Sequence, residues 1–350
     1  MRVLIVKTSS LGDVVHTLPA VTDAAAAIPG IRFDWVVEEA FTEIPSAHPA
    51  VERVIPIALR RWRKNRKCAL FKASTFGSRA GFQTFAQNLR RKKYDLIIDA
   101  QGLMFKSALV AMLAKGPRAG YDRSSARDPW VALTYGQCHR VSREQHAIAR
   151  VRQLFAQALK YKLPETAPEY GLAQQDKIQT ERPPYLLFLH GTTWPSKHWP
   201  EHYWAELITL ATQQGLMVHL PWGSDEERLR AERLVADHPA VQILPQMNLT
   251  ELMQELCGAI GVVGLDSGLS HLAAALSVPG VTIYGSTRAD LTGVIGSHHQ
   301  NLVAEFPCAP CLKQVCNYVG ESSVQPACYE PLTPATVWDC FQKQIQWRAA

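Results

Sequence analysis

Three stretches of this 350-residue chain place polar and charged side chains directly after an apolar run. The first is KTSSLGD, residues 7–13, which follows the apolar run Val3–Val6 and ends in a carboxylate. The second is HGTTWPSK, residues 190–197, and the third is GLDSGLSH, residues 264–271. A carboxylate can take a proton, whereas hydroxyls, a lysine and the backbone N–H groups of a helix start can hold an anion.

Asp13 is the candidate base of the first stretch. A dinucleotide-binding loop would read G-x-G-x-x-G here, but only Gly12 is present, which argues against a nicotinamide or flavin cofactor. Aspartate is also favoured at helix starts as a cap. The residue alone therefore leaves capping and proton transfer equally open.

The second stretch has the composition of a diphosphate site. Thr192 and Thr193 supply hydroxyls, and Lys197 supplies a point charge beyond a glycine. The alternative is a surface loop with a solvated lysine.

The third stretch, with Asp266 at its centre, joins a buried strand to a helix. The free amides of Ser267 and Gly268 would point at an anion, and His271 lies one turn along the same face. A packed histidine is the alternative. The G-x-S-x-G elbow is absent, so Ser267 is not predicted to be a nucleophile.

An acidic run, WGSDEE at residues 222–227, follows another predicted strand. A carboxylate such as Glu227 could accept hydrogen bonds from ribose hydroxyls there. Acids are also common at helix starts, so a structural role stays open.

Residues 60–93 hold twelve Lys and Arg and no Asp or Glu. The remainder has 25 basic against 31 acidic residues, so the net charge of +6 arises from this basic segment. Such asymmetry indicates a local anionic partner: nucleic acid, a membrane surface or an anionic substrate. A solvated helical face is the alternative.

The cysteines cluster late in the chain, at Cys308, Cys311, Cys316 and Cys328. C-x2-C is a zinc-like spacing, but the rest is irregular, so a structural metal and free thiols both stay open. The apolar N-terminal run is too short for a signal peptide. We therefore expect a cytoplasmic protein without disulfides.

The elements that must position these motifs alternate between strand-like and helix-like runs. Predicted strands are 3–6, 33–37, 54–57, 96–98, 185–189, 217–220, 241–244, 261–265 and 281–284, with helical periodicity between most of them. This alternation predicts an α/β fold with parallel sheets and right-handed crossovers. The length exceeds one core, so we expect domains at 1–165 and 180–333, a linker within 161–184 and a final helix at 334–350.

Several strings together resemble a known family. They are MRVLIVKTSSLGDVVHTLPAVTDA, FDWVVEEAFTEIP, VERVIPIALRRWRK, DLIIDAQGL, HGTTWPSKHWPEHYW, LPWGSDEE and GLDSGLSHLAAAL. They resemble the ADP-heptose glycosyltransferases of GT-B fold, and among these the heptosyltransferases I of lipopolysaccharide core biosynthesis. The resemblance covers nearly the whole chain.

The resemblance implies two Rossmann-like doubly wound domains with a cleft between them, the final helix crossing back to the first. It implies ADP-heptose as donor, the inner-core Kdo of Kdo-lipid A as acceptor, and an inverting transfer without metal or cofactor. The expected location is cytoplasmic, peripheral on the anionic cytoplasmic face of the inner membrane. No nucleic acid is expected as a partner.

The resemblance also assigns roles to single residues. The implied catalytic residues are Asp13, as general base, and Lys197. The implied donor contacts are Thr192, Thr193, Lys197, Glu227, Met247, Asp266, Ser267, Gly268 and His271. The expected acceptor contacts are Ser10, Gly12, Arg60, Arg61, Arg63 and Lys64, on the first domain.

Two departures keep alternatives open. Residues 285–290 read GSTRAD where relatives read Gly-Pro-Thr-Asp-Pro, so donor-sugar contacts there are in doubt. The late cysteines are more familiar from heptosyltransferase II, which is the alternative together with other nucleotide-sugar transferases. A nucleic-acid or other anion-binding protein without activity would explain the basic segment but not the phosphate-like loops. Nothing in the chain tells whether the acceptor has one or two Kdo units.

Overall fold

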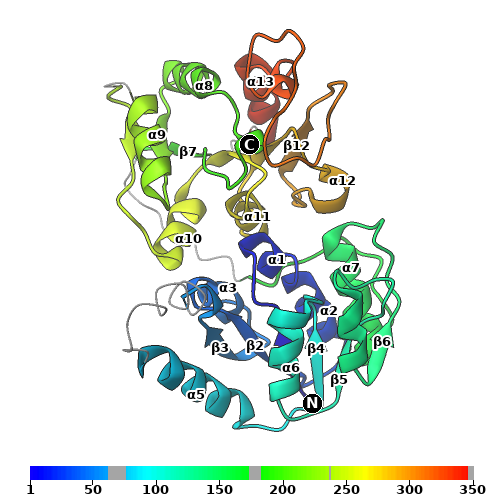
Figure 1. Ribbon diagram of the computed structural model, residues 1–350. Helices are drawn as coiled ribbons and strands as arrows, with labels where there is room; N and C mark the ends of the chain where they lie inside the picture. The colour runs from blue at the N-terminus through cyan, green and yellow to red at the C-terminus, as the bar shows by residue number, and fades with distance from the viewer. Residues whose placement is uncertain (62–75, 173–182, 236–237, 346–350) are drawn as a thin grey trace. The chain divides into compact units, whose positions relative to one another are not determined.

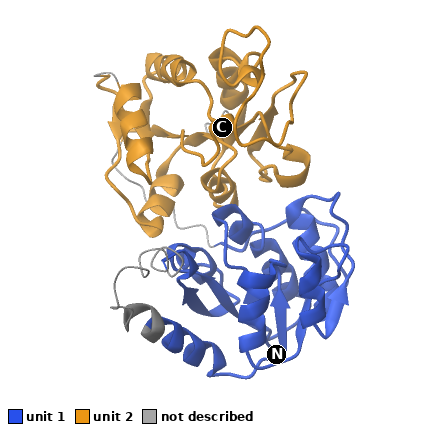
Figure 2. Cartoon of the chain, in the orientation of Figure 1, with its two compact units in different colours: residues 1–173 blue, residues 174–350 orange. Residues whose placement is uncertain are grey.

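The computed structural model describes residues 1–61, 76–172, 183–235 and 238–345 (Figure 1). The chain divides into two compact units, unit 1 at Met1–Ala173 and unit 2 at Gln174–Ala350 (Figure 2). Each unit holds one six-stranded sheet. Every registered strand pair in both sheets is parallel, which confirms the predicted doubly wound α/β class. Arg63 and Lys64 lie outside the described residues.

The sheet of unit 1 has the strand order β3-β2-β1-β4-β5-β6. Its strands are β1 Arg2–Val6, β2 Arg32–Glu38, β3 Val51–Ile57, β4 Leu96–Asp99, β5 Arg118–Tyr121 and β6 Gln137–His139. Its helices are α1 Leu11–Val15, α2 Leu18–Ala27, α3 Glu43–Ser46, α5 Phe76–Arg90, the π-helix Met104–Ala108 that runs into α6 Leu109–Leu113, and α7 Ala147–Leu159. The inner strands are apolar because helices cover both faces of the sheet.

Unit 1 differs from the predicted elements in two places. The helical periodicity between the first two predicted strands corresponds to two helices, since α1 ends at Val15 and α2 begins at Leu18 with Pro19 in its first turn. Strands β5 and β6 were not predicted. Their sequences, RAGY and QCH, are short and partly polar, so they lack the apolar run that marks a buried strand.

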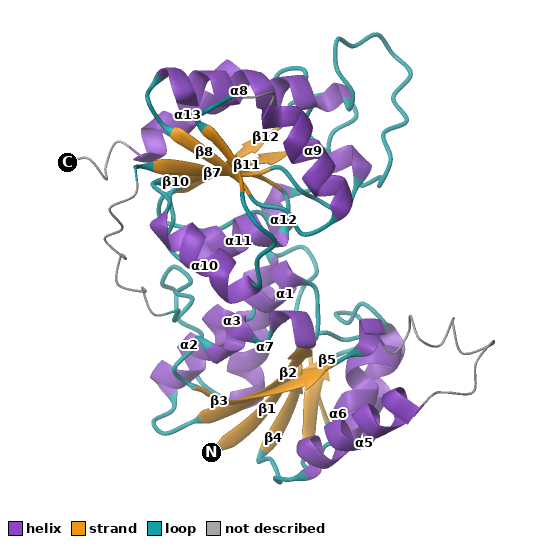
Figure 3. Cartoon of the chain, turned by 90° about the vertical axis from the view of Figure 1, so that its left-hand side faces the viewer, coloured by secondary structure: helices purple, strands orange, loops and turns teal. Residues whose placement is uncertain are grey.

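The sheet of unit 2 has the strand order β12-β11-β10-β7-β8-β9. Its strands are β7 Tyr185–Leu189, β8 Met217–Leu220, β9 Val241–Ile243, β10 Gly261–Leu265, β11 Gly280–Tyr284 and β12 His299–Val303. Its helices are α8 Glu201–Gln213, α9 Asp225–Val235, α10 Leu249–Gly258, α11 Gly268–Ala275, α12 Ala289–Thr292 and α13 Pro334–Ile345. Figure 3 shows helices on both faces of this sheet. The edge strand β12, HQNLV, escaped prediction because it is largely polar.

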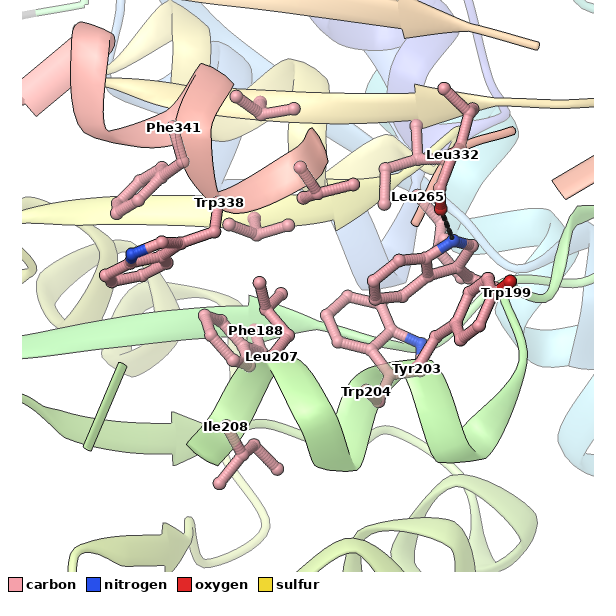
Figure 4. Packing of buried hydrophobic residues seen from close by; sticks show 14 of the residues in the cluster. Phe188, Trp199, Tyr203, Trp204, Leu207, Ile208, Leu265, Leu332, Trp338 and Phe341 are labelled. Carbon is pink, nitrogen blue, oxygen red and sulfur yellow. Dashed lines mark hydrogen bonds between the residues drawn. The ribbon is translucent and has the colours of Figure 1, made fainter. Parts of the chain in front are cut away.

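The core of unit 2 is rich in aromatic side chains (Figure 4). Trp199 and Trp204 pack edge to face with ring centroids 5.2 Å apart. The indole N–H of Trp199 donates to the carbonyl of Leu332 at 2.9 Å, so the buried ring keeps its hydrogen bond. Helix α13 supplies Trp338 and Phe341 to this core and packs against α8 and β11. Its predicted crossing to the first domain stays a prediction.

Each sheet reverses its direction of winding at one point. The reversal falls between β1 and β4 in unit 1 and between β7 and β10 in unit 2. Ligands of doubly wound sheets bind outside the carboxyl ends of the strands at such a point. The loops after β1, β7 and β10 are the three motifs of the sequence, so both switch points carry candidate chemistry. No helix within the described part of the chain is long and apolar enough to cross a bilayer.

Buried neutral histidines predict that acid destabilises the fold. His48 is 2% exposed and His190 is fully buried, and burial lowers the pKa of each to about 4. The unfolded chain binds these protons near pH 6.5 and the folded chain does not, so stability falls as the pH drops below 6.5. We expect the free energy of unfolding to be lower at pH 5 than at pH 7.5 by about 2 kcal/mol for each histidine.

Urea unfolding at the two pH values measures this effect. The variant His48→Asn removes one of the titrating rings and should lose part of the pH dependence. Equal unfolding free energies at both pH values would contradict the prediction.

Candidate functional site

In unit 2, three loops at the carboxyl ends of strands meet at Asp266. Lys197 Nζ lies 2.6 Å from Asp266 Oδ2, and Thr287 Oγ1 donates to the same oxygen at 2.6 Å. Thr192 Oγ1 donates to the main-chain carbonyl of Asp266 at 3.2 Å. The lysine and aspartate side chains are only 16% and 10% exposed. The structure thus brings predicted residues of the second and third motifs together at the switch point between β7 and β10.

The start of α11 is open for an anion. Ser267 is its N-cap, with extended backbone and no side-chain cap hydrogen bond. Within the described parts of the chain, Ser267 Oγ is buried without a hydrogen-bond partner. Gly268 begins the helix, and His271 follows one turn later, 5% exposed. Free N–H groups and the helix dipole favour a bound phosphate here.

Glu227 lies beside the loop after β7. Its Oε2 accepts a hydrogen bond from the N–H of Gly223 at 2.7 Å. A Cβ at Gly191 would lie 2.3 Å from Glu227 Oε1, so a larger residue there would displace this carboxylate. The carboxylate therefore sits at the same edge of the sheet as Lys197, and it can accept from hydroxyl groups. Thr193, the neighbouring predicted contact, is exposed.

Met247 follows β9 and lines a cavity of about 460 Å³. Leu244 and Pro245 line the same cavity, which extends to Tyr185 and His219. The Trp222 indole N–H donates to the carbonyl of Leu244 at 2.7 Å and holds the end of β9 in place. This cavity, with apolar side chains and a few polar groups in its lining, is suited to a flat base such as adenine.

A second cluster lies in unit 1, at the carboxyl end of β1. Asp13 Oδ1 lies 3.1 Å from Lys7 Nζ, and Asp13 Oδ2 accepts from the N–H and hydroxyl of Ser10 at 2.9 and 3.0 Å. Lys7 also donates to the carbonyl of Ala100 at 3.2 Å. Asp13 keeps 46% of its side chain exposed, and Lys7 only 9%. The Asp13 carboxylate is held in place by Lys7 and Ser10 and is still accessible to a substrate. Gly12 is buried and directly precedes Asp13 in the first turn of α1.

The charge on Asp13 is strongly favoured. The partial burial of Asp13 acts to raise its pKa, but the Lys7 ammonium, the hydrogen bond from the Ser10 N–H and the charge of His16 outweigh this effect and lower the pKa to about 2. Asp13 is therefore ionised at neutral and mildly acidic pH. It is ready to accept a proton without first losing one.

Removing the Lys7 charge should expose the titration of Asp13. A base works only when ionised, so turnover falls as the pH drops through its pKa. In Lys7→Met the ammonium that lowers the pKa of Asp13 is gone, so the acid limb of the kcat profile should move up to about pH 4, where an ordinary aspartate titrates. The exposed Lys106→Met variant is the matched control. Superimposable pH profiles of Lys7→Met and the unaltered chain would rule out this coupling.

Several functional side chains escaped prediction. Lys7 directly follows the buried strand β1, and a charged residue in that place was the available signal. Gln101 accepts from the N–H and hydroxyl of Thr8 and donates to the carbonyl of Ser9 at 2.6 Å, which fixes the loop before Asp13. Thr287 lies in the GSTRAD stretch and contacts Asp266 despite the departure from the relatives' pattern. In the same stretch Arg288 pairs with Asp290 at 2.6 Å.

The basic segment has acidic neighbours from other parts of the chain. Arg61 pairs with Glu39 at 3.1 Å, and Lys92 pairs with Glu52 at 3.3 Å. The Arg60 guanidinium lies 5.1 Å from the Phe41 ring centroid. The positive charge of residues 60–93 is thus compensated in part by Glu39, in the turn after β2, and by Glu52 in β3. Arg61 nevertheless keeps 61% of its side chain exposed to a partner.

The late cysteines lie close enough to influence one another. Burial raises the pKa of the Cys328 thiol to about 12, and neighbouring Cys308, Cys316 and Cys311 contribute to the shift. Cys308 is exposed, whereas Cys328 is buried. Across residues 1–61, 76–172, 183–235 and 238–345, no group of three or more His, Cys, Asp or Glu side chains is placed to hold a metal ion.

The chain matches a known protein family along most of its length. The model of glycosyltransferase family 9 (heptosyltransferase) matches residues 82–320. A lipopolysaccharide heptosyltransferase 1 of Pseudomonas aeruginosa is 50% identical over 347 residues, 96% of each chain. A lipopolysaccharide heptosyltransferase 2 of Salmonella typhimurium is 26% identical over 319 residues, 83% of this chain and 85% of that one.

The solved structures agree with the sequence relatives. E. coli heptosyltransferase WaaC with ADP is 44% identical and superposes with a TM-score of 0.85 over 98% of this chain and 100% of that one. The same enzyme with ADP-2-deoxy-2-fluoro heptose is 43% identical, with a TM-score of 0.81 over 98% of this chain and 99% of that one. Since the family model spans more than half of the chain, and relatives covered almost end to end share about half of their residues with it, the chain belongs to glycosyltransferase family 9, the heptosyltransferases.

Proposed function

We propose that this glycosyltransferase moves L-glycero-D-manno-heptose from ADP-heptose to the inner-core Kdo of Kdo-lipid A. The observation that carries the proposal is the anion site of unit 2, where Lys197, the start of α11 and Glu227 share the carboxyl edge of one sheet. That edge belongs to a chain which is similar along almost its whole length to an enzyme solved with ADP and with an ADP-heptose analogue.

The donor would be held by unit 2. The diphosphate lies on Lys197, Thr192, Thr193 and the amides of Ser267 and Gly268, with His271 beside them. Glu227 accepts from the ribose hydroxyls, and the adenine rests against Met247. Lys197 and the helix dipole stabilise the negative charge that grows on the departing ADP.

Asp13 would act as the base of an inverting transfer. The acceptor hydroxyl oxygen attacks the anomeric carbon, the bond from that carbon to the diphosphate oxygen breaks, and Asp13 takes the hydroxyl proton. A carboxylate with so low a pKa accepts this proton late, when the new glycosidic bond has made the hydroxyl strongly acidic. Ser10 and Gly12 lie in the same loop and would contact the acceptor.

Transfer to a defined acceptor tests the proposal. The unaltered chain with ADP-heptose should convert Kdo-lipid A into heptosyl-Kdo-lipid A, measured by mass spectrometry. The stronger likeness to heptosyltransferase 1 than to heptosyltransferase 2 favours Kdo over heptose as the acceptor sugar. A chain that glycosylates only heptosyl-Kdo-lipid A would be a heptosyltransferase II. A chain that accepts UDP-sugars but not ADP-heptose would be a transferase with a different donor specificity.

We also infer that the enzyme works at the cytoplasmic face of the inner membrane, with the basic segment turned to the acceptor and to anionic lipid. Arg60, Arg61, Arg90 and Arg91 are exposed. Each Lys or Arg near an anionic surface contributes about 1 kcal/mol at low salt, and salt screens it.

Neutralising the segment should weaken the acceptor side alone. Replacing Arg60, Arg61, Arg63 and Lys64 with Gln should raise the acceptor KM and lower binding to anionic vesicles by about tenfold or more at low salt. The control replaces four exposed cations elsewhere in unit 1, Arg127, Arg140, Lys160 and Lys162. The affinity for ADP should stay constant in both variants. Weaker ADP binding with unchanged KM and vesicle sedimentation would move the segment to the donor side.

A further inference from the structure

The main chain around Lys197 is held by groups that the proposed reaction does not use. The Tyr329 hydroxyl donates to the carbonyl of Lys197 at 2.9 Å from 132 residues further along the chain. Ser196 is 1% exposed; its N–H donates to the carbonyl of Gln314 at 3.0 Å and its hydroxyl to that of Lys313 at 2.5 Å. The loop that carries Ser196 and Lys197 is thus hydrogen-bonded to residues 308–332, which we call the supporting segment.

The supporting segment also binds the loop that follows β11. The Leu312 N–H donates to the carbonyl of Ser286 at 2.7 Å, and the hydroxyls of Ser286 and Ser196 lie 3.0 Å apart. Ser286 precedes Thr287, whose hydroxyl donates to Asp266. Ser196 therefore links the loop that carries the ammonium to the loop that fixes the carboxylate of the same ion pair.

The supporting segment has a rigid base. Its carbonyl at Leu332 accepts from the Trp199 indole, two residues after Lys197, and Trp199 belongs to the aromatic core in Figure 4. Tyr329 is fully buried in that core. Ser196, Lys197 and Trp199, which span the turn, are thereby all hydrogen-bonded to the supporting segment.

A lysine needs such support when its position matters. Its long side chain has several rotatable bonds, and their rotamer entropy must be overcome before the ammonium can serve as a fixed charge. Asp266 holds the ammonium, and the Trp194 ring centroid lies 4.8 Å from Nζ. These contacts can fix the charge only if the backbone of Lys197 does not move. A fixed charge stabilises a departing diphosphate without reorganisation.

We propose that Ser196 and Tyr329 are positioning residues for Lys197, and that the supporting segment is the template for the diphosphate site. The role in transfer rests on the proposed function. The role in holding the ion pair does not, because it follows from contacts within unit 2.

Two variants that keep the core intact test the proposal. Ser196→Ala removes the hydroxyl bonds to Lys313 and Ser286, and Tyr329→Phe removes only the bond to Lys197. Each should weaken ADP binding about fivefold by calorimetry and lower kcat about tenfold, with little change in acceptor KM. In a Lys197→Ala background the same changes should alter ADP affinity less than about twofold, because residues that act through one another are not additive.

The control is Ser322→Ala, in the same segment. Its hydroxyl donates to the carbonyl of Val324 at 3.0 Å and lies 3.3 Å from Glu330 Oε2, and neither of these residues belongs to the lysine loop. This variant should lower Tm as the others do and leave ADP affinity and kcat unchanged. The proposal would be overturned if Ser196→Ala and Tyr329→Phe lowered the ADP affinity equally in the unaltered chain and in the Lys197→Ala background. It would also be overturned if neither variant lowered the ADP affinity of the unaltered chain.

Crystal structures of the ligand-free variants separate this proposal from the proposed function. In Ser196→Ala and Tyr329→Phe the distance from Lys197 Nζ to Asp266 should exceed 4 Å or the lysine should take several conformers. An ion pair unchanged in both variants would contradict the positioning role, whatever the enzyme transfers. An unaltered chain that binds ADP but does not glycosylate Kdo-lipid A would instead refute the proposed function alone.

Discussion

Replacing Asp13 with Asn is expected to lower kcat by about 10²-fold or more, because the variant cannot take the acceptor proton. The fold should persist. Asp13 accepts hydrogen bonds from the N–H and hydroxyl of Ser10, and the amide oxygen of Asn can accept in the same way. Affinity for ADP should change little, since the donor motifs belong to unit 2. The loss would therefore lie in turnover rather than in stability or donor binding.

This substitution separates a base from a helix cap. Asp122 is a suitable control, because it also accepts from a hydroxyl and a backbone N–H nearby, those of Ser124 and Ser125. Asp122→Asn should keep near-normal turnover. Steady-state kinetics with ADP-heptose and Kdo-lipid A, together with ADP calorimetry, measure both variants. An Asp13→Asn enzyme with near-normal kcat would mean that Asp13 only caps α1.

Replacing Lys197 with Ala is expected to weaken ADP binding and slow transfer, together by about 3 kcal/mol, as for the loss of a charge that stabilises the transition state. The effect has two parts. The variant lacks the ammonium that meets the diphosphate, and it leaves the Asp266 carboxylate, 10% exposed, without its cation. An uncompensated buried carboxylate repels a diphosphate and is costly in itself.

A second substitution divides the two parts. Lys197→Ala combined with Asp266→Asn should regain part of the ADP affinity, because the repulsion is gone, and little of the turnover. His271→Ala should act in the same direction as Lys197→Ala. The control is Lys313→Ala, which removes an exposed ammonium that donates to Asn317 Oδ1 at 3.0 Å. Unchanged ADP affinity and unchanged turnover in Lys197→Ala and His271→Ala would remove both residues from the site.

Much of the fold was predictable because buried parallel strands are continuous apolar runs. YLLFL and GVVGL are fully buried as β7 and β10, as their composition requires. The missed strands β5, β6 and β12 form through pairing with a neighbour, and their own residues carry little apolar signal. The break between α1 and α2 was not predicted, although proline is common in the first turn of a helix and Pro19 lies in the first turn of α2.

By itself the sequence determined which residue types follow the strands, and hence which edge of each sheet carries chemistry. This holds because the carboxyl ends of parallel strands lie at one edge whatever the details of the loops. The charge asymmetry of residues 60–93 was equally visible. It could not reveal the Glu39 and Glu52 partners, which come from other parts of unit 1.

Only the tertiary structure decided which of these side chains meet. The pairs of Lys7 with Asp13 and of Lys197 with Asp266 depend on loop geometry and strand order, and periodicity reports burial but not strand order. The low pKa of Asp13 arises from a balance between burial and neighbouring charges at about 3 Å. The support of Lys197 by Ser196 and Tyr329 joins residues 132 positions apart. Such distances are set when the chain packs, because long-range contacts are specified by the three-dimensional arrangement of the core and not by neighbours along the chain.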